Sequence, residues 1–92
     1  MRFKIIDKSM EPTFREGDYV LVNKLYRQIR KGDVVVIRHP LEKKFLLKRI
    51  SKVLENKYFV IGDNRKESHD SRKFGSVDKK LIVGKLLMHI KK

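Results

Sequence analysis

Two side chains in this 92-residue sequence could together cleave a peptide bond: the hydroxyl of Ser9 and the amine of Lys48. Lys48 lies in the run Phe45–Ile50, the most apolar surroundings of any lysine in the chain. If its side chain faces inward with Leu46 and Ile50, loss of hydration lowers its pKa. A neutral lysine amine can accept the proton of a serine hydroxyl. By pattern alone, a surface lysine on an edge strand is the commoner case.

Ser9 stands at a bend between the apolar run Phe3–Ile6 and the turn that Pro12 introduces. A serine at such a corner can expose its hydroxyl while neighbouring backbone N–H groups form an oxyanion hole. Helix N-capping explains Ser9 equally well, because Pro12 could occupy the first position of one short helical turn over residues 11–15. Ser9 alone therefore does not decide between a catalytic and a structural role.

The sequence offers weak material for a metal site or a histidine-based triad. It contains no cysteine, and its three histidines are scattered without HxxxH spacing. His69, Asp70 and Ser71 are consecutive, whereas catalytic triads are assembled from distant segments. A polar turn explains these three residues better. We therefore expect neither a metal nor another cofactor.

Short apolar runs separated by turn signals predict a small all-β domain over residues 1–92. Three Gly-Asp pairs mark turns beside the runs. The expected architecture is a partly open β-barrel or a sandwich of short antiparallel strands, and the polar segment 63–73 is expected to be a long functional loop. The predicted strands are Phe3–Ile6, Tyr19–Val22, Val34–Ile37, Phe45–Ile50, Tyr58–Ile61 and Leu81–Ile90.

The charge of the chain favours anionic partners without choosing among them. Lys and Arg number 24 and Asp and Glu 11, which gives a net charge of +13. A basic β-barrel that binds nucleic acid is one alternative, with Phe45, Tyr58 and Phe59 stacking on bases. Only 9% of the residues are aromatic, however, and those in strands suit the core equally. This alternative is disfavoured because it leaves the segment Ser68–Arg72 unexplained.

Five segments, in this order, resemble the bacterial type I signal peptidases of the S26 group. They are Ser9–Thr13, Gly17–Lys24, Gly32–Val36, Lys48–Ile50 and Gly62–Arg72. The last segment matches the family signature GDNxxxSxDSR at every defined position. The resemblance covers nearly the whole chain. It implies a serine endopeptidase with a Ser–Lys dyad that removes N-terminal leader or signal peptides from precursor proteins.

The resemblance also implies a role for each matching residue. Ser9 would attack the scissile carbonyl, and Lys48 would accept its proton. Ser68 would orient the lysine amine by a hydrogen bond. Asp70 and Arg72 would form a supporting ion pair, which suits the bidentate grip of a guanidinium on a carboxylate.

Two departures from the family pattern affect these expectations. Family members often carry a hydroxyl residue two places before the nucleophile as an oxyanion donor, and here that residue is Asp7. Because a carboxylate would repel an oxyanion, we expect Asp7 to point away, leaving the backbone N–H of Ser9, beside Met10, to supply most of the oxyanion hole. The large inserted β-domain and the membrane-spanning segments are also missing. The chain is most similar to short peptidases described as nickel-type superoxide dismutase maturation proteases.

The expected partner is a precursor or leader peptide, bound as an extended strand at a β-edge near Ser9. Peripheral contact with an anionic membrane would also suit the charge. The chain as it stands is expected to be soluble, cytoplasmic if it is a maturation protease and membrane-associated if an anchor precedes it. Two alternatives remain open: a self-cleaving peptidase of the SOS-repressor type, which shares the dyad and a similar β-fold, and a peptidase fold without activity.

Overall fold

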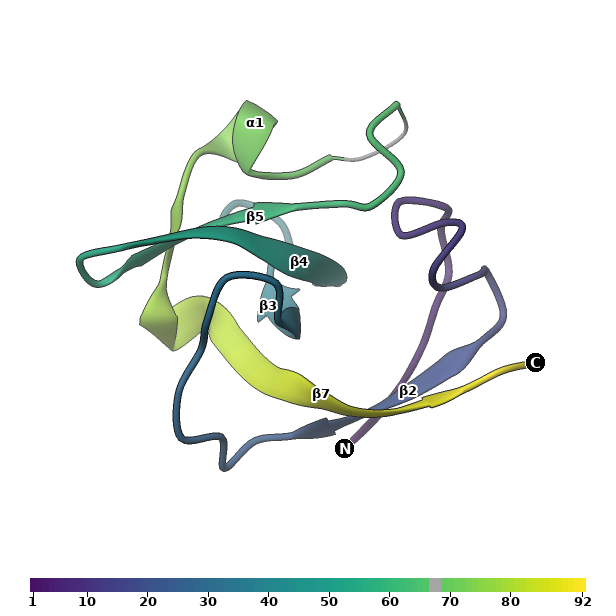
Figure 1. Cartoon of the computed structure of the whole chain (residues 1–92). Helices are drawn as coiled ribbons and strands as arrows, with labels where there is room; N and C mark the ends of the chain where they lie inside the picture. The colour runs from purple at the N-terminus through teal and green to yellow at the C-terminus, as the bar shows by residue number, and fades with distance from the viewer. Residues whose placement is uncertain (67–68) are drawn as a thin grey trace.

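The computed structural model describes residues 1–66 and 69–92, and nearly all of its regular structure is β-strand (Figure 1). The strands join in one seven-stranded sheet with the order β1-β2-β7-β3-β4-β5-β6, and every neighbouring pair is antiparallel. The helical elements are short. The elements are β1 (Arg2–Lys4), β2 (Tyr19–Asn23), β3 (Val34–Arg38), β4 (Phe45–Leu54), β5 (Lys57–Ile61), α1 (Ser71–Phe74), β6 (Val77–Asp78), the 3-10 helix η1 (Lys79–Leu81) and β7 (Ile82–Ile90).

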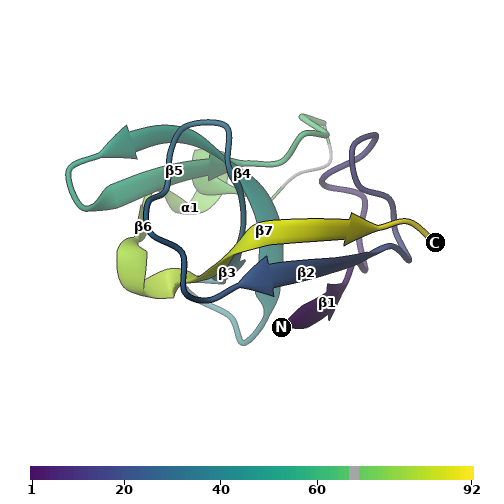
Figure 2. The same cartoon turned by 60° about the horizontal axis from the view of Figure 1, so that its bottom comes forward.

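The C-terminal strand β7 completes the sheet by pairing with β2 on one side and β3 on the other. The sheet folds over on itself, so that β4 and β5 lie across from β2 and β7 (Figures 1 and 2). Strands β1 and β6 are its two edges. The predicted all-β class is confirmed, and the single curled sheet corresponds to the partly open barrel rather than to the sandwich.

The central strand β3 explains how so small a domain holds two apolar clusters. All four residues of the run 34–37 are buried, because the strand is covered on both faces. Val35 and Ile37 pack in one cluster with β4 and β5 residues. Val34 and Val36 pack in the other, together with Met10 and Phe14 from the segment that carries Ser9. The core therefore holds the turn around Ser9 against the sheet.

Two local predictions are wrong. Residues 11–15 form turns rather than a helical turn, and the helix lies instead at Ser71–Phe74, where it begins within the expected loop 63–73 and ends one residue beyond it. Asp70 caps that helix by accepting the N–H of Arg72 at 3.1 Å. Strand β6 was not predicted, since it has only two residues. Within the described part of the chain, no helix has the length and apolar character to cross a bilayer.

Candidate active site

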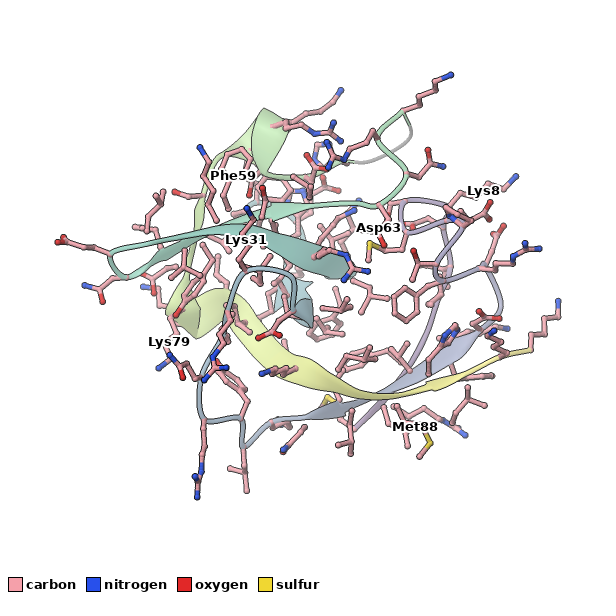
Figure 3. All side chains as sticks on the ribbon, viewed as in Figure 1. Lys8, Lys31, Phe59, Asp63, Lys79 and Met88 are labelled. Carbon is pink, nitrogen blue, oxygen red and sulfur yellow. The ribbon has the colours of Figure 1, made fainter. Side chains whose placement is uncertain are left out.

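Core packing and hydrogen bonds from a distant segment fix the turn that carries Ser9. Ser9 and Met10 are only 4% and 1% exposed. Asn64 donates its backbone N–H to the carbonyl of Ser9 at 2.8 Å and its side-chain amide to the carbonyl of Lys8 at 3.0 Å. The N–H of Asp63 points to Met10 Sδ at 3.4 Å. The segment after β5 therefore sets the position of the serine, while the Lys8 side chain points outward (Figure 3).

Lys48 projects from β4 into the interior and is 1% exposed, among the most deeply buried side chains of the described chain. Its neighbours at alternate positions, Leu46 and Ile50, are buried on the same face. Burial lowers the pKa of Lys48, while the negative charges of Asp7 and Asp70 act in the opposite direction and limit that fall. The amine thus interacts electrostatically with the segment that carries Ser9 and with the segment that carries Asp70.

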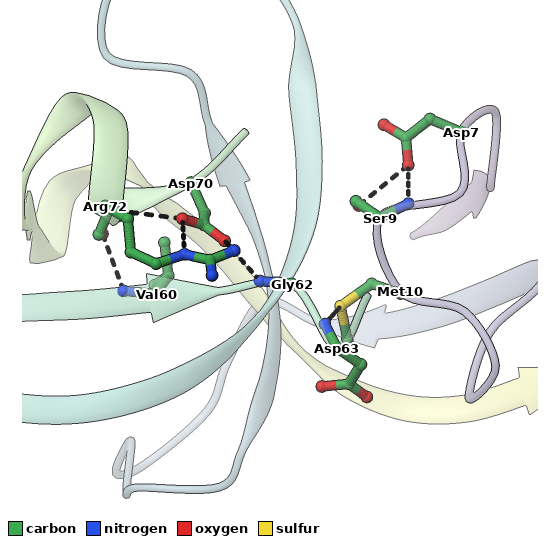
Figure 4. A network of polar contacts seen from close by, with 9 residues as sticks. Asp7, Ser9, Met10, Val60, Gly62, Asp63, Asp70 and Arg72 are labelled. Carbon is green, nitrogen blue, oxygen red and sulfur yellow. Dashed lines mark hydrogen bonds and ion pairs between the residues drawn. The ribbon is translucent and has the colours of Figure 1, made fainter. Parts of the chain in front are cut away.

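Asp70 and Arg72 form a bidentate ion pair on the other side of this centre (Figure 4). Both carboxylate oxygens of Asp70 accept guanidinium N–H groups at 2.9 Å, and the side chain of Asp70 is fully buried. One oxygen also accepts the N–H of Gly62 at 2.9 Å. The hydroxyl of Ser71 accepts the N–H of Val60 at 2.8 Å, so this residue is a structural clasp rather than a nucleophile. These bonds fasten the signature segment to β5.

Three positioning residues had no role in the sequence-based account. Arg49 grips Asp63 with two hydrogen bonds of 2.8 Å and donates a third to the carbonyl of Gly32. Asp63 is adjacent to Asn64, which holds the turn of Ser9. Because neighbouring strand residues face opposite sides, Lys48 enters the interior while Arg49 binds the segment after β5. The bond between Arg49 and Asp63 could have been sought in the sequence, because both residues belong to the motifs Lys48-Arg49 and Gly62-Asp63-Asn64.

A largely apolar hollow of about 320 Å³ lies beside the turn of Ser9. Its walls are the chain from Phe3 to Asp7 and the segment from Lys44 to Leu47, which leads into β4, and Val20 and Val36 also line it. The first wall includes residues of the edge strand β1, whereas β4 lies between β3 and β5 in the sheet. An extended peptide entering this hollow would meet Asp7, two residues from the serine.

The expectation that Asp7 points away from Ser9 is wrong. The same carboxylate oxygen of Asp7 accepts the Ser9 N–H at 3.1 Å and the Ser9 hydroxyl at 3.0 Å (Figure 4). The cause is local: with only one residue between them, the carboxylate can turn back onto the first free N–H of the bend, as in an Asx turn. The N–H predicted to supply the oxyanion hole is therefore already bonded.

The remaining predicted residues are placed as follows. Ser68 lies outside the described residues. The side chain of Met10 packs in the core, and its carbonyl accepts the N–H of Phe14 at 2.9 Å. The structure thus brings Ser9, Lys48, Asp70 and Arg72 into one region from three separate segments of the chain.

A second polar cluster joins His39, Glu42 and His69, whose donor atoms lie within 4.8 Å of one another. The histidines are distant in sequence, yet their Nε2 atoms are 3.1 Å apart, their rings stack on each other, and both rings meet Phe74 in an edge-on arrangement. Nδ1 of His39 accepts the N–H groups of Leu41 and Glu42, which places the His39 proton on Nε2. A metal at that Nε2 would require moving the proton against both N–H groups. We assign this cluster as a hydrogen-bonded clasp.

The clasp predicts a pH-dependent stability. Burial lowers the pKa of His39, with His69 and Lys44 adding to the effect and Glu42 opposing it. The neutral form is thus favoured on folding, so the stabilisation is complete above the unfolded pKa of about 6.5 and is lost as the pH falls below it. The variant His39→Asn retains an acceptor for both N–H groups but does not titrate. The test is the free energy of unfolding in urea at about pH 7.5 and 5.5. It should fall more between these two pH values in the wild type than in His39→Asn, and an equal fall in both would contradict the assignment.

The chain has clear similarity to known peptidases. A family model described as Peptidase S24-like matches residues 1–87. Signal peptidase I V of Bacillus subtilis (strain 168) is 30% identical over 136 residues, covering 89% of this chain and 80% of that protein. Mitochondrial inner membrane protease subunit 1 of Xenopus tropicalis is 31% identical over 106 residues, covering 89% and 64%. Inactive signal peptidase IA of Staphylococcus aureus (strain MRSA252) is 26% identical over 128 residues, covering 89% and 74%.

The alignment with the Bacillus protein is longer than this chain, 136 positions against 92 residues, so that relative has additional residues inside the matched region. The region matched by the family model, residues 1–87, includes both the turn of Ser9 and most of β7. Since the family model matches most of the chain and the Bacillus signal peptidase is covered over four-fifths of its length, this chain belongs to the signal peptidase I group of the Peptidase S24-like family.

Proposed function

We propose that this chain is a serine endopeptidase that uses Ser9 as nucleophile and Lys48 as general base to remove leader peptides from precursor proteins. The observation that carries the proposal is the environment of Lys48. Its amine is buried, its pKa is lowered by that burial, and it interacts with charges on the segment of Ser9 and on the signature segment. Burying a lysine amine destabilises the folded protein, and ionisable groups with shifted pKa values are concentrated at functional sites. A role as general base is one explanation for its burial here.

The proposed reaction follows from these groups. Neutral Lys48 takes the hydroxyl proton of Ser9 as the oxygen attacks the scissile carbonyl, and then returns it to the leaving amine, which leaves the acyl fragment as an ester on Ser9. Neutral Lys48 next takes a proton from the water that attacks this ester, and returns it to the Ser9 oxygen as the fragment leaves with a new carboxyl terminus. The Ser9 N–H stabilises the developing oxyanion once its present bond is released. Ser68 would orient the lysine amine. Asp70, paired with Arg72, would tie the signature segment to the end of β5 through the N–H of Gly62 and so keep its charge near the lysine.

The hollow beside Ser9 supplies a place for the substrate. We infer that a leader peptide lies in it as an extended strand, making backbone hydrogen bonds to a neighbouring chain segment and placing apolar side chains against its walls. Lys4 and Lys44 on the rim favour an acidic precursor or an anionic membrane surface nearby. If this chain acts like the short peptidases that mature nickel-type superoxide dismutase, its substrate would be the precursor of such an enzyme.

Cleavage of a peptide panel tests the proposal. Each peptide spans a leader junction and carries alanine, leucine or lysine immediately before the expected cut, and mass spectrometry maps the products. We expect a single cut after alanine, with the lysine peptide intact. The named inactivity of the Staphylococcus aureus relatives defines the competing outcome: a folded protein that leaves every peptide intact would be an inactive member of the family.

The lowered pKa of Lys48 predicts the pH dependence of the reaction. Only the neutral amine accepts a proton, so kcat/KM rises with pH as Lys48 loses its proton. Burial places the midpoint below the value of about 10.4 for a free lysine. A series of initial rates from about pH 6 to 10 measures this midpoint. A rate that is flat or falls across the range would remove Lys48 from the role of base.

A further inference from the structure

The contact between Asp7 and Ser9 is not explained by the proposed reaction. Ser9 is 4% exposed, whereas Asp7 is exposed and also lines the hollow beside it. One oxygen of this carboxylate takes both polar hydrogens that the nucleophile offers, the N–H at 3.1 Å and the hydroxyl at 3.0 Å. Asp7 therefore lies between the hollow and the serine.

The Asp7 carboxylate oxygen lies where the carbonyl oxygen of a scissile peptide bond would be expected. A scissile carbonyl must put its carbon next to the serine hydroxyl and its oxygen next to the serine N–H. The Asp7 oxygen already meets both groups and carries the negative charge that a tetrahedral intermediate would develop there. A substrate carbonyl and the Asp7 carboxylate cannot both occupy this place.

We propose that Asp7 is a built-in occupant of the oxyanion site, which keeps Ser9 inactive until a bound peptide displaces the carboxylate from the serine. The proposal rests on the proposed function for its effect on rate, while its structural part stands without it. Displacement is feasible because Asp7 is exposed and borders the hollow in which a peptide would lie. Asp7 is thus a residue that slows the reaction, not a catalytic residue.

The charge of the Asp7 carboxylate should slow the reaction in two further ways. Its charge favours the protonated form of Lys48, as does that of Asp70, while Lys44 and Arg72 act against it. Its charge also repels the oxyanion if it remains close during the reaction. An alternative role is that of the base itself, because the Asp7 carboxylate accepts the hydrogen bond that the Ser9 hydroxyl donates. The two roles predict opposite effects of removing the carboxylate.

Substitutions at Asp7 separate these roles. We expect Asp7→Ser to raise kcat/KM for a leader peptide by about tenfold, since a hydroxyl can donate to the oxyanion. Asp7→Ala should give a smaller rise, and both should move the midpoint of the pH profile to lower pH. Glu55→Gln removes the same charge from an exposed turn and should change neither value. A fall in rate for Asp7→Ser and Asp7→Ala would overturn the proposal in favour of a required base.

A second measurement does not depend on activity. In ¹H–¹⁵N spectra, Asp7→Ala should shift the Ser9 amide signal strongly, because the N–H loses the carboxylate oxygen that accepts it at 3.1 Å, whereas Glu55→Gln should leave this signal in place. If the amide does not respond, the carboxylate is not on the Ser9 N–H and the inference is wrong even if the peptidase is active. If the amide responds but neither the wild type nor Asp7→Ser cleaves, the occupant is real, and it is the proposed peptidase function and the block on catalysis that fail.

Discussion

Replacing Lys48 with methionine is expected to lower kcat/KM at least about 10³-fold while leaving the domain folded, because methionine fills the same interior space without an amine. The lysine is 1% exposed and packs between apolar neighbours, so the substitution removes a buried charge rather than a surface one. Peptide cleavage and circular dichroism of the purified variant measure the two effects. Activity within about tenfold of the wild type would contradict the assignment of the base.

The absence of cysteine from the chain allows a sharper control. The variant Lys48→Cys has one thiol, and alkylation of the unfolded protein with 2-bromoethylamine followed by refolding rebuilds a side chain of lysine length that ends in an amine. We expect Lys48→Cys to be inactive before alkylation and to recover a substantial part of the wild-type rate after it. Unchanged inactivity in a refolded, fully alkylated protein would mean that an amine at this position is not sufficient.

Loss of the Asp70 carboxylate is expected to have the second largest effect. In Asp70→Ala the guanidinium of Arg72, whose side chain is 38% exposed, and the buried N–H of Gly62 both lose the carboxylate that accepts them. The N–H of Gly62 is left without an acceptor in the interior and helix α1 loses its cap, which together should lower the free energy of unfolding by about 2 kcal/mol. Activity should fall as well, because the same bonds hold the signature segment beside Lys48. Urea unfolding and peptide cleavage report the two losses separately.

Asp78→Ala is the matched control for this variant. Asp78 caps the helix η1 by accepting the N–H of Lys80 at 3.0 Å, but its side chain is 42% exposed. Its removal should cost much less stability and leave kcat/KM unchanged. Asp70→Asn keeps the shape and part of the hydrogen bonding, so it should fall between the two. A loss for Asp70→Ala no larger than that for Asp78→Ala would show that the ion pair contributes little.

Strand positions could be read from the sequence because each apolar run in this chain is bounded by a turn signal. The six predicted strands all appear, with ends shifted by a few residues, most at β4, which continues to Leu54. The short helix α1 could not be foreseen, since its start depends on Asp70 acting as a cap while also binding Arg72. Likewise, the turn of Ser9 is set by the packing of Met10 in the core and by the hydrogen bond from Asn64 rather than by a helical tendency of residues 11–15.

The site shows the same division between local pattern and tertiary contact. The inward side of β4 follows from alternation, so the burial of Lys48 could be anticipated from Leu46 and Ile50. The bond between Asp7 and Ser9 could not be anticipated in this way. The expectation that Asp7 points away came from its repulsion of an oxyanion, and no oxyanion is present in the protein without substrate. The pairing of His39 with His69 required the fold, which brings together residues 30 positions apart.

The most direct test of the account is cleavage of an alanine-junction precursor by the wild type and by Ser9→Ala, followed by mass spectrometry under identical conditions. Ser9→Ala removes one oxygen and leaves the packing of Met10 and the bond from Asn64 to the backbone intact. We expect the wild type to release two fragments from one cut and the variant, folded to the same extent, to release none. Cleavage by Ser9→Ala at the wild-type rate would contradict the central claim that Ser9 is the nucleophile.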